Sequence, residues 1–192
     1  MPSTIAAWAP GGLAAAILVS EILIGRQQRL EPDEDGGADR GSHRLIWLVM
    51  VPSIVLASIV AKRQPAGAFV LPAGGWIAVG IVFAAGATLR WWAVRSLGRL
   101  FTVRVAIREG HRLVTAGPYA WLRHPAYTGV LLQFLAMGLG FQHVLSLCLV
   151  LGASVAALAW RIAVEEAALA ARFGADWTAF ASRRARVLPG LW

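Results

Sequence analysis

Cysteine is almost missing from this sequence, in which Cys148 is the one example among 192 residues. A single sulfur cannot form an intrachain disulfide, and it cannot build a thiolate metal site by itself. We therefore predict no disulfide and no metal site. We interpret Cys148 as a small apolar residue packed in the core, deep in the last hydrophobic segment.

Charged residues are also missing, or nearly so, from four long stretches of the chain. These stretches are 5–24, in which Glu21 is the one charged residue, 45–61, 66–89 and 127–160. A bilayer core about 30 Å thick is crossed by a helix of about 20 apolar residues, so the first three stretches predict one span each. The last is too long for one helix and predicts two, at 128–141 and 144–162, with a tight turn at 140–143.

The composition supports this interpretation. Hydrophobic residues make up 58% of the chain, and its mean hydropathy of +0.63 is too high for an ordinary soluble domain. The sequence therefore predicts an all-α integral membrane protein with about five transmembrane helices.

Acidic residues are few, 10 against 18 lysines and arginines, which leaves a formal net charge of +8. A net positive charge of this size is compatible with binding to nucleic acid. However, sixteen of the basic residues lie in only three segments, 25–44, 90–127 and 161–192. Lys62 and Arg63 alone lie in the second predicted loop. By the positive-inside rule we predict an outside N-terminus, cytoplasmic placement of the three segments, and no nucleic-acid partner. No basic residue precedes the first span, so we expect no cleaved signal peptide.

The tail predicts two further helices. The segment RIAVEEAALAARF continues the last span and ends at Gly174, and a short helix follows over ADWTAFASRR. The residues Leu169, Phe173, Trp177 and Phe180 recur at spacings of four, four and three. This spacing predicts an apolar stripe that lies along the membrane surface.

Three polar blocks interrupt the apolar second half: GHRLVTAGPY at 110–119, RHPAYTG at 123–129 and EEAALAARFG at 165–174. The charge distribution predicts all three on the cytoplasmic face. In this order and at these gaps, the blocks resemble the isoprenylcysteine carboxyl methyltransferase family. The resemblance runs from Leu97 to the end of the chain, whereas residues 1–90 resemble the family only in hydropathy.

The resemblance implies an integral membrane enzyme that uses S-adenosyl-L-methionine without a Rossmann-like domain. The sequence agrees, because it has no GxGxxG motif and no room for an α/β domain. The resemblance also implies cytoplasmic C-terminal helices that cap a cofactor pocket. We predict two regions: transmembrane helices one to three at 1–96, with a mobile cytoplasmic loop at 25–44, and a catalytic region at 97–192. The catalytic region holds the cofactor-binding loop, the helical hairpin and the C-terminal helices.

The family's site residues carry over onto matching positions of this chain. The resemblance implies that Glu165 faces the cofactor and that Arg161, one turn earlier, contacts the substrate, which makes these two the predicted catalytic residues. The other cofactor-binding residues that it implies are His111, Arg112, Leu113, Val114, Tyr119, His124, Pro125, Ala126 and Tyr127. Eukaryotic members carry a glutamine ahead of the first of these positions, and this sequence has no counterpart for it.

The residue types suit methyl transfer from a sulfonium to a carboxylate. Glu165 can bind the ammonium group of S-adenosylmethionine, and Tyr119, Trp121 and Tyr127 can flank its adenine ring or its sulfonium. Arg161 can hold a substrate carboxylate by two parallel hydrogen bonds, and an ionised carboxylate needs no general base. A poorly hydrated pocket favours this reaction, because opposite charges cancel as the methyl group moves. We predict a lipophilic substrate, either a small molecule or a lipidated peptide, that enters from the membrane lipids.

Structural interpretations of the same residues stay open. Arg161 and Glu165 could form an ordinary pair on a helix surface, and His124 could serve only to cap the fourth helix. The aromatic residues of the blocks could be interfacial anchors. Glu21 is expected near the cytoplasmic end of its span with its carboxylate in water. Second-rank candidates, expected to be structural or at the pocket rim, are Glu166 and Arg172.

Other functions also stay open. A phospholipid or lipid-amine N-methyltransferase resembles this chain around the cofactor, although Arg161 would be a poor neighbour for an amine that must lose a proton. A sterol-reductase-like membrane oxidoreductase resembles the C-terminal region, although five spans are few for it. A membrane scaffold without activity gives no reason for Arg161 and Glu165 to accompany both loop blocks. The sequence therefore favours a carboxyl methyltransferase with a prenylcysteine-like substrate.

Overall fold

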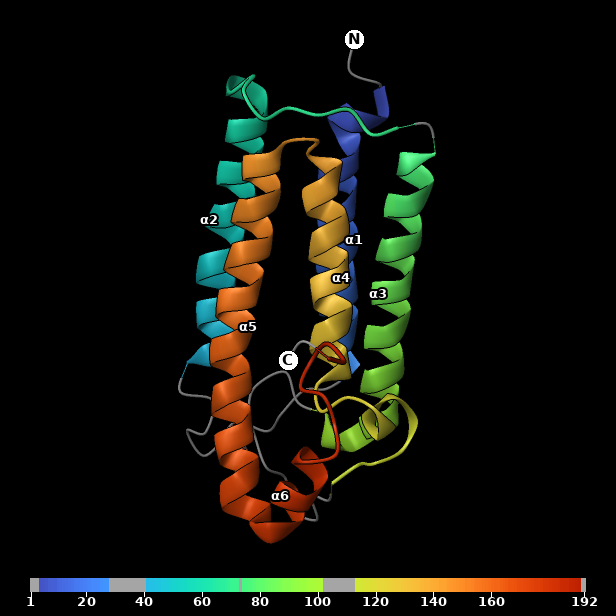
Figure 1. Cartoon of the computed structure of the whole chain (residues 1–192), viewed down its shortest axis with the longest axis vertical. Helices are drawn as coiled ribbons and strands as arrows, with labels where there is room; N and C mark the ends of the chain where they lie inside the picture. The colour runs from blue at the N-terminus through green and yellow to red at the C-terminus, as the bar shows by residue number, and fades with distance from the viewer. Residues whose placement is uncertain (1–3, 28–40, 73, 102–112, 191–192) are drawn as a thin grey trace.

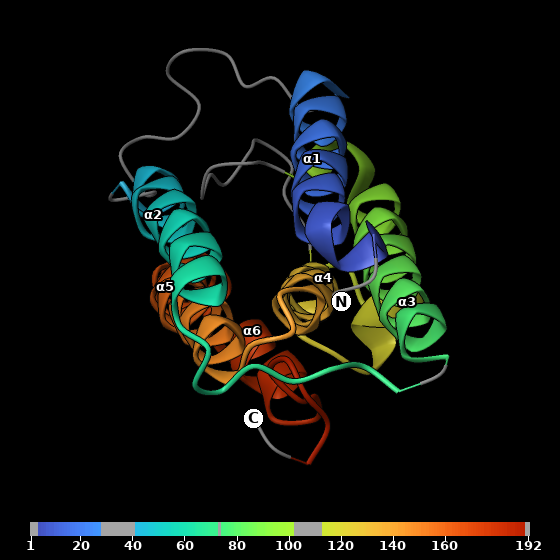
Figure 2. The ribbon, with the colours of Figure 1, turned by 90° about the horizontal axis from the view of Figure 1, so that it is seen from above.

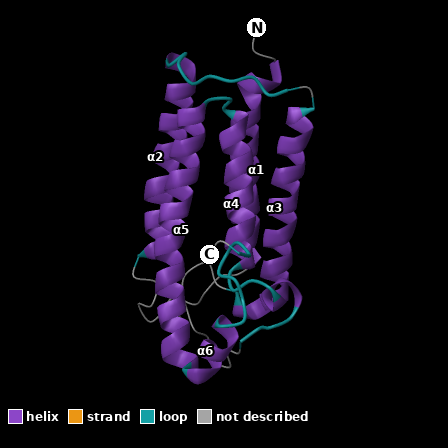
Figure 3. Cartoon of the chain, in the orientation of Figure 1, coloured by secondary structure: helices purple, strands orange, loops and turns teal. Residues whose placement is uncertain are grey.

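The computed structural model of the chain describes residues 4–27, 41–72, 74–101 and 113–190. Within these residues it contains helices joined by loops, and the extended pairing is limited to isolated bridges. The elements in chain order are α1 (Thr4–Gln27), α2 (Ser42–Arg63), α3 (Gly75–Leu97), η1 (Gly98–Leu100), η2 (Gly117–Ala120), α4 (Pro125–Gly140), α5 (Val144–Phe173) and α6 (Ala175–Ala181). Figure 3 shows that the described loops lie at the two ends of the bundle.

In the part of the chain that the structure describes, four helices, α1, α2, α3 and α5, are long and apolar enough to cross a membrane. Large apolar side chains cover their outer surfaces, and Trp8, Leu48 and Ile77 are 76%, 71% and 69% exposed. Water would disfavour so much exposed apolar surface, whereas the hydrocarbon of a bilayer favours it. The prediction of an all-α, multi-pass integral membrane protein is confirmed. The apolar helix α4 has 16 residues, so the count of five spans stays a prediction.

The helices α1 to α5 run side by side, and α6 lies at one end of the bundle (Figure 1). Helix α3 packs along α4, α2 packs along α5, α4 joins α5, and α1 lies on α4. Viewed from above, α1 with α3 and α4 forms one group, and α2 with α5 forms another (Figure 2). We call the end at 138–146 the turn end and the end formed by 117–128 with 161–187 the site end.

Two glycines allow α3 and α4 to touch backbone to backbone. A Cβ atom on Gly86 would lie 2.6 Å from the carbonyl oxygen of Gly129, and one on Gly129 would lie 2.5 Å from that of Gly86. Any side chain at either position would force the helices apart. The same contact places Arg90 beside α4, because its backbone nitrogen would lie 2.8 Å from a Cβ on Gly129.

The turn end confirms the predicted helical hairpin, since α4 ends at Gly140 and α5 begins at Val144. His143 is buried and caps α5: its Nδ1 accepts a hydrogen bond from the Ser146 backbone N–H at 3.3 Å. That bond leaves its Nε2–H to donate to the carbonyl oxygen of Ala66 at 3.0 Å. The neutral ring thus ties the segment after α2 to the start of α5.

Several predictions about the helices are wrong. The third span begins at Gly75, because the proline- and glycine-containing segment 66–72 runs as a loop past the hairpin turn. Cys148 is exposed on the outer surface of α5. Trp177 and Phe180 are buried with their rings stacked at 5.5 Å, so they do not form an apolar stripe on the membrane surface. The residues 28–40 of the predicted mobile loop lie outside the described residues.

Candidate active site

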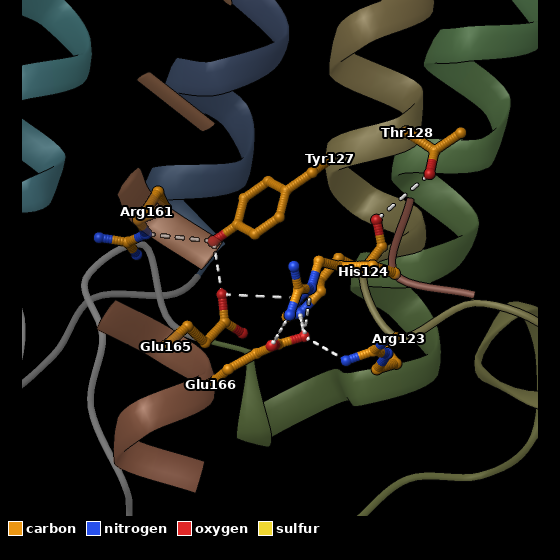
Figure 4. Close-up of polar contacts among 8 residues, drawn as sticks. Arg123, His124, Tyr127, Thr128, Arg161, Glu165 and Glu166 are labelled. Atoms are coloured by element: carbon orange, nitrogen blue, oxygen red, sulfur yellow. Dashed lines mark hydrogen bonds and ion pairs between the residues drawn. The ribbon is translucent and has the colours of Figure 1, made fainter. Parts of the chain in front are cut away.

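The hydroxyl of Tyr127 lies between Arg161 and Glu165 at the site end (Figure 4). Pro125 begins α4, and Tyr127 follows in its first turn, where it faces α5. Its hydroxyl donates to Glu165 Oε2 at 2.6 Å and accepts from Arg161 Nε at 3.1 Å. Arg161 is 3% exposed, whereas the Glu165 side chain is 32% exposed. The structure therefore links the two predicted catalytic residues through a third predicted site residue.

His124 stands next to both acids of the third block. Its ring stacks on Tyr127 with centroids 5.6 Å apart, and its Nδ1 lies 3.9 Å from Glu165 Oε2. Its Nε2 lies 3.0 Å from Glu166 Oε1. His124 is the N-cap residue of α4 and its carbonyl oxygen accepts from the backbone N–H of Tyr127 and Thr128, but its side chain makes no capping bond and belongs to this polar cluster.

Glu166 is the centre of a mostly buried ion cluster. Its carboxylate, 14% exposed, accepts from Arg123 Nη1 at 2.9 Å and from Arg186 Nη2 at 2.9 Å, in addition to its contact with His124. These partners come from the loop before α4 and from the C-terminal tail. Glu166 therefore holds three chain segments together, and this supports the structural interpretation of that residue.

The C-terminal segment 184–187 lies across the loop that precedes α4. Sequence reasoning missed this contact, because backbone groups make most of it and leave no side-chain pattern. The hydrogen bonds, donor first, are Arg123 N–H to Ala185 O at 2.8 Å, His124 N–H to Arg186 O at 3.0 Å, Thr128 Oγ1 to Val187 O at 2.7 Å, and Arg184 Nε to Tyr119 O at 2.8 Å. The segment fixes the loop that carries His124.

Tyr119 and Ala126 form a small buried cluster with Ala93 of α3, and Val114 packs against it. Burial, and after it the charge of Glu165, raises the pKa of Tyr119 well above its ordinary value. The Tyr119 hydroxyl is therefore neutral at physiological pH. The cluster places Tyr119 near Glu165 and links the first two sequence blocks.

The remaining predicted site residues have different positions. Pro125 is fully buried at the start of α4, and Leu113 is partly buried where the described chain resumes. His111 and Arg112 lie outside the described residues. Trp121 is 65% exposed and makes an edge contact with Trp92 at 6.2 Å, so the structure favours its interpretation as an anchor.

An apolar cavity of about 140 Å³ lies beside Tyr127 and Arg161. Residues of α1, α2, α4 and α5 form most of its wall, among them Ile17, Met50, Val130, Phe134, Met137 and Leu158. Its charged residues, among those that the structure describes, are Glu21, Arg90 and Arg161. The Glu21 carboxylate, for which the sequence predicted only contact with water, is paired with Arg90, from which it accepts two hydrogen bonds, both of 2.6 Å.

Comparison with known proteins places this arrangement in a family. The model of the isoprenylcysteine carboxyl methyltransferase family matches residues 77–171. Protein-S-isoprenylcysteine O-methyltransferase B of Arabidopsis thaliana is 31% identical over 156 residues, which cover 68% of this chain and 76% of that protein. The chain belongs to the isoprenylcysteine carboxyl methyltransferase family. The match begins within α3, earlier than the resemblance from Leu97 had indicated.

The chain is also similar to two further proteins. The protein YpbQ of Bacillus subtilis (strain 168) is 27% identical over 166 residues, which cover 82% of this chain and 95% of that protein. The solved structure of a eukaryotic intramembrane Ras methyltransferase, an isoprenylcysteine carboxyl methyltransferase, has a TM-score of 0.60 and 25% identity. It covers 75% of this chain, and this chain spans about half of it, 52%. Membership of the family confirms the prediction of a methyltransferase.

Proposed function

We propose that this protein transfers a methyl group from S-adenosylmethionine to the carboxylate of a lipophilic substrate, which becomes a methyl ester. The observation that carries the proposal is the Tyr127 hydroxyl bonded to both Arg161 and Glu165 at the polar end of an apolar cavity. The Glu165 carboxylate can bind a cationic group and the Arg161 guanidinium can bind an anionic one. The two are joined by a single tyrosine hydroxyl. Its place in a family of carboxyl methyltransferases supports the same activity.

The surroundings of Glu165 suit S-adenosylmethionine. Its partly exposed carboxylate is available to an ammonium group, and the stacked rings of His124 and Tyr127 lie beside it. Aromatic faces and carboxylates attract the positive charges that this cofactor carries. When bound, S-adenosylmethionine supplies a methyl group on a positively charged sulfur. We assign the cofactor-binding role to Glu165 and to the predicted residues of the first two blocks.

Arg161 is the proposed carboxylate-binding residue. Its guanidinium lines the cavity, is 3% exposed, and is oriented by the hydrogen bond from its Nε to Tyr127. A guanidinium binds a carboxylate through two parallel hydrogen bonds, which orients the nucleophilic oxygen as well as attracting it. Arg161, oriented by Tyr127, thus holds the acceptor oxygen close to the cofactor that we assign to Glu165. The apolar wall of the cavity keeps water away from the reacting groups.

The apolar cavity supports a substrate with a hydrocarbon tail. Its wall is formed mostly by apolar side chains of the long apolar helices. A hydrocarbon tail that moves from the bilayer into the cavity therefore stays in apolar surroundings. The acceptor class that we propose is a prenylcysteine-like carboxylate, either small or at the end of a lipidated peptide. The clustering of basic residues supports a cytoplasmic site end and an outside N-terminus.

Binding of S-adenosylhomocysteine to the purified full chain in detergent tests the cofactor half of the proposal. We expect saturable binding, and we expect Glu165→Gln to raise the Kd at least tenfold through the loss of a charged partner, which is worth about 1.5–3 kcal/mol. Asp176→Asn, at an exposed acid of α6, is the matched control and should leave the Kd unchanged. Equal Kd values for Glu165→Gln and the control would overturn the assignment.

The chemical stability of the product tests the acceptor half. The probe is N-acetyl-S-farnesylcysteine, incubated with S-adenosylmethionine that carries a radioactive methyl group. A methyl ester releases labelled methanol in mild base, and we expect this release from the wild-type reaction. Label that resists base, or label that appears only with a lipid amine, would overturn carboxyl methylation and favour an N-methyltransferase.

A further inference from the structure

An exposed aromatic and basic surface lies on α3 at the site end, and its residues do not line the cavity. Trp92 is 45% exposed, and its ring meets that of Trp121, which is 65% exposed, with the ring centroids 6.2 Å apart. Arg95 is exposed in the last turn of α3, and its guanidinium carbon lies 5.4 Å from the centroid of the Trp91 ring. We call Trp92, Arg95 and Trp121 the α3 patch.

The α3 patch lies at the level where α3 would leave a bilayer. With a rise of about 1.5 Å per residue, Arg95 is roughly 30 Å from the start of the helix at Gly75, which is the thickness of a hydrocarbon core. Trp92 is roughly 26 Å from the same start. Tryptophan is enriched at the boundary between hydrocarbon and headgroups. A bilayer that begins at Gly75 therefore has this boundary at the two exposed rings and its headgroups at Arg95.

One exposed face of α3 leads from the hydrocarbon region to the patch. Its exposed residues recur at spacings of three or four, which is the periodicity of one helix face. They are Ile77, Ile81, Ala84, Thr88, Trp92 and Arg95. A long apolar chain that lies along this face would therefore end at the α3 patch.

The protein leaves the charge of Arg95 without an acidic partner. Within the part of the chain that the structure describes, the Glu21 and Glu166 carboxylates at this end are bound to other arginines. The contact with the Trp91 ring orients the Arg95 guanidinium but brings no negative charge. A basic residue in the last turn also interacts favourably with the helix dipole, but this effect does not account for two exposed tryptophans beside it.

The α3 patch joins α3 to the loop before α4. Trp121 directly follows η2, and Gly117, at the start of η2, lies against the helix. A Cβ atom on Gly117, whose φ is 61°, would lie 2.9 Å from Ser96 Oγ and 3.3 Å from Trp92 Nε1. The same loop carries the buried Tyr119. A ligand that contacts both exposed rings would therefore hold this loop on α3.

We propose that the α3 patch binds the headgroup of an anionic phospholipid and that the bound lipid holds the loop 117–124 against α3. Arg95 binds the phosphate through charge-assisted hydrogen bonds, and the rings of Trp92 and Trp121 lie beside the glycerol and the upper acyl chains. The binding does not depend on the proposed methyl transfer. Its effect is on the loop that carries Tyr119, so the lipid composition of the membrane sets how firmly predicted cofactor-binding residues are held.

Native mass spectrometry of the full chain in detergent, titrated with dioleoylphosphatidylglycerol, tests the binding. We expect the first molecule of this lipid to bind about fivefold more tightly than dioleoylphosphatidylcholine, which is the factor that one arginine near an anionic headgroup supplies. Arg95→Gln should abolish this preference, and Arg95→Lys should retain most of it because the charge stays. Trp121→Ala should weaken the binding of both lipids.

Arg172→Gln is the matched control. Arg172 is an exposed arginine in the last turn of α5, at the same end of the bundle but in the other group of helices (Figure 2). This variant should keep the preference for the anionic lipid. An equal loss in Arg172→Gln and Arg95→Gln would indicate a diffuse positive surface and would overturn the inference, as would equal binding of the two lipids by the wild type. Displacement of the lipid by a soluble polyglutamate peptide would instead assign the patch to an acidic protein.

Hydrogen exchange in nanodiscs of phosphatidylcholine, with and without phosphatidylglycerol, tests the effect on the loop. We expect the amides of 119–124 to exchange more slowly when the anionic lipid is present, and we expect no such change in Arg95→Gln. The amides of the hairpin turn at 141–146 are the internal control. Exchange at 119–124 that does not respond to the lipid would overturn this half of the inference. Neither measurement uses S-adenosylmethionine, so a failure here leaves the proposed function standing.

Discussion

The two ends of the α4–α5 hairpin satisfy their buried polar groups in opposite ways. At the turn end, residues 138–146 include no lysine, arginine, aspartate or glutamate, and the neutral ring of His143 bonds to backbone groups. At the site end, Arg161, Glu165 and Glu166 lie within two turns of one helix and bond to partners from other segments.

Neutral groups join the chain segments at the turn end, whereas the charged groups of the site end include both a structural cluster around Glu166 and the residues of the proposed active site. Backbone groups and one imidazole are sufficient to close the hairpin at the turn end. Charged side chains would join the helices no better, because their burial costs free energy that good geometry must offset. At the site end, Glu166 joins three chain segments, whereas Arg161 lines the adjacent cavity, where the proposed function gives it a ligand.

The largest expected effect at the site end follows from loss of the Glu166 charge. Glu166→Gln would leave the guanidinium groups of Arg123 and Arg186 without their carboxylate in a mostly buried cluster. We expect a loss of about 3 kcal/mol in unfolding free energy. Thermal unfolding in detergent measures it, with Asp176→Asn as the exposed control. Equal midpoints for the two variants would show that the cluster contributes little to stability.

Removal of one hydroxyl tests the link between the two proposed catalytic residues. Tyr127→Phe keeps the ring and its stacking on His124 but loses the bonds to Arg161 and Glu165. We expect kcat/KM for the farnesylcysteine probe to fall tenfold to thirtyfold, which corresponds to about 1.4–2 kcal/mol. The loss of two hydrogen bonds, each worth about 1 kcal/mol, should also lower the midpoint of thermal unfolding, by less than Glu166→Gln does. An unaltered kcat/KM would remove Tyr127 from the proposed site.

The turn end should show the opposite response. His143→Ala removes the cap of α5 and the bond to Ala66, and we expect it to lower the unfolding free energy by about 1–2 kcal/mol. The activity of the folded protein should stay at the wild-type level, because His143 lies at the end of the bundle remote from Tyr127. Thermal unfolding and probe methylation, measured on the same sample, check both parts. Lost activity at full stability would contradict the contrast between the ends.

The smallest expected effect concerns the C-terminal segment. Thr128→Val keeps the shape of the side chain but loses the hydrogen bond to Val187, worth about 1 kcal/mol. We expect faster trypsin cleavage after the arginines of 184–187 and a small rise in the Kd for S-adenosylhomocysteine. Thr178→Val, at an exposed hydroxyl of α6, is the matched control. Equal cleavage rates would show that the bond does not hold the segment.

Local signals predicted much of the fold. Pro125 marks the start of α4, and Gly174, with a φ of 52°, ends α5 where the sequence placed the break. The residues proposed for the site, Arg161, Glu165 and Tyr127, could be named from the sequence because three blocks in a fixed order resemble a family. The charge-free stretches predicted the membrane class, because lipid exposure requires apolar side chains over whole helices.

Long-range pairings were not accessible from the sequence. Glu21 and Arg90 are separated by 69 positions, and each alone has the appearance of a charge near the end of a span. The segment 184–187 binds mainly through its backbone, which leaves no side-chain pattern to find. Trp177 and Phe180 have helical spacing, but spacing alone does not show whether the apolar side of α6 faces lipid or protein.

The glycine contact between α3 and α4 has a mechanical consequence. Because Gly86 and Gly129 approach each other at their backbones, no side chain separates the two helices at this level, where one could otherwise slide or tilt against the other. The contact lies one turn from Arg90 on α3 and close to Tyr127 on α4. We therefore expect a bulky guest in the cavity to displace α1, α2 or α5 more readily than it separates α3 from α4.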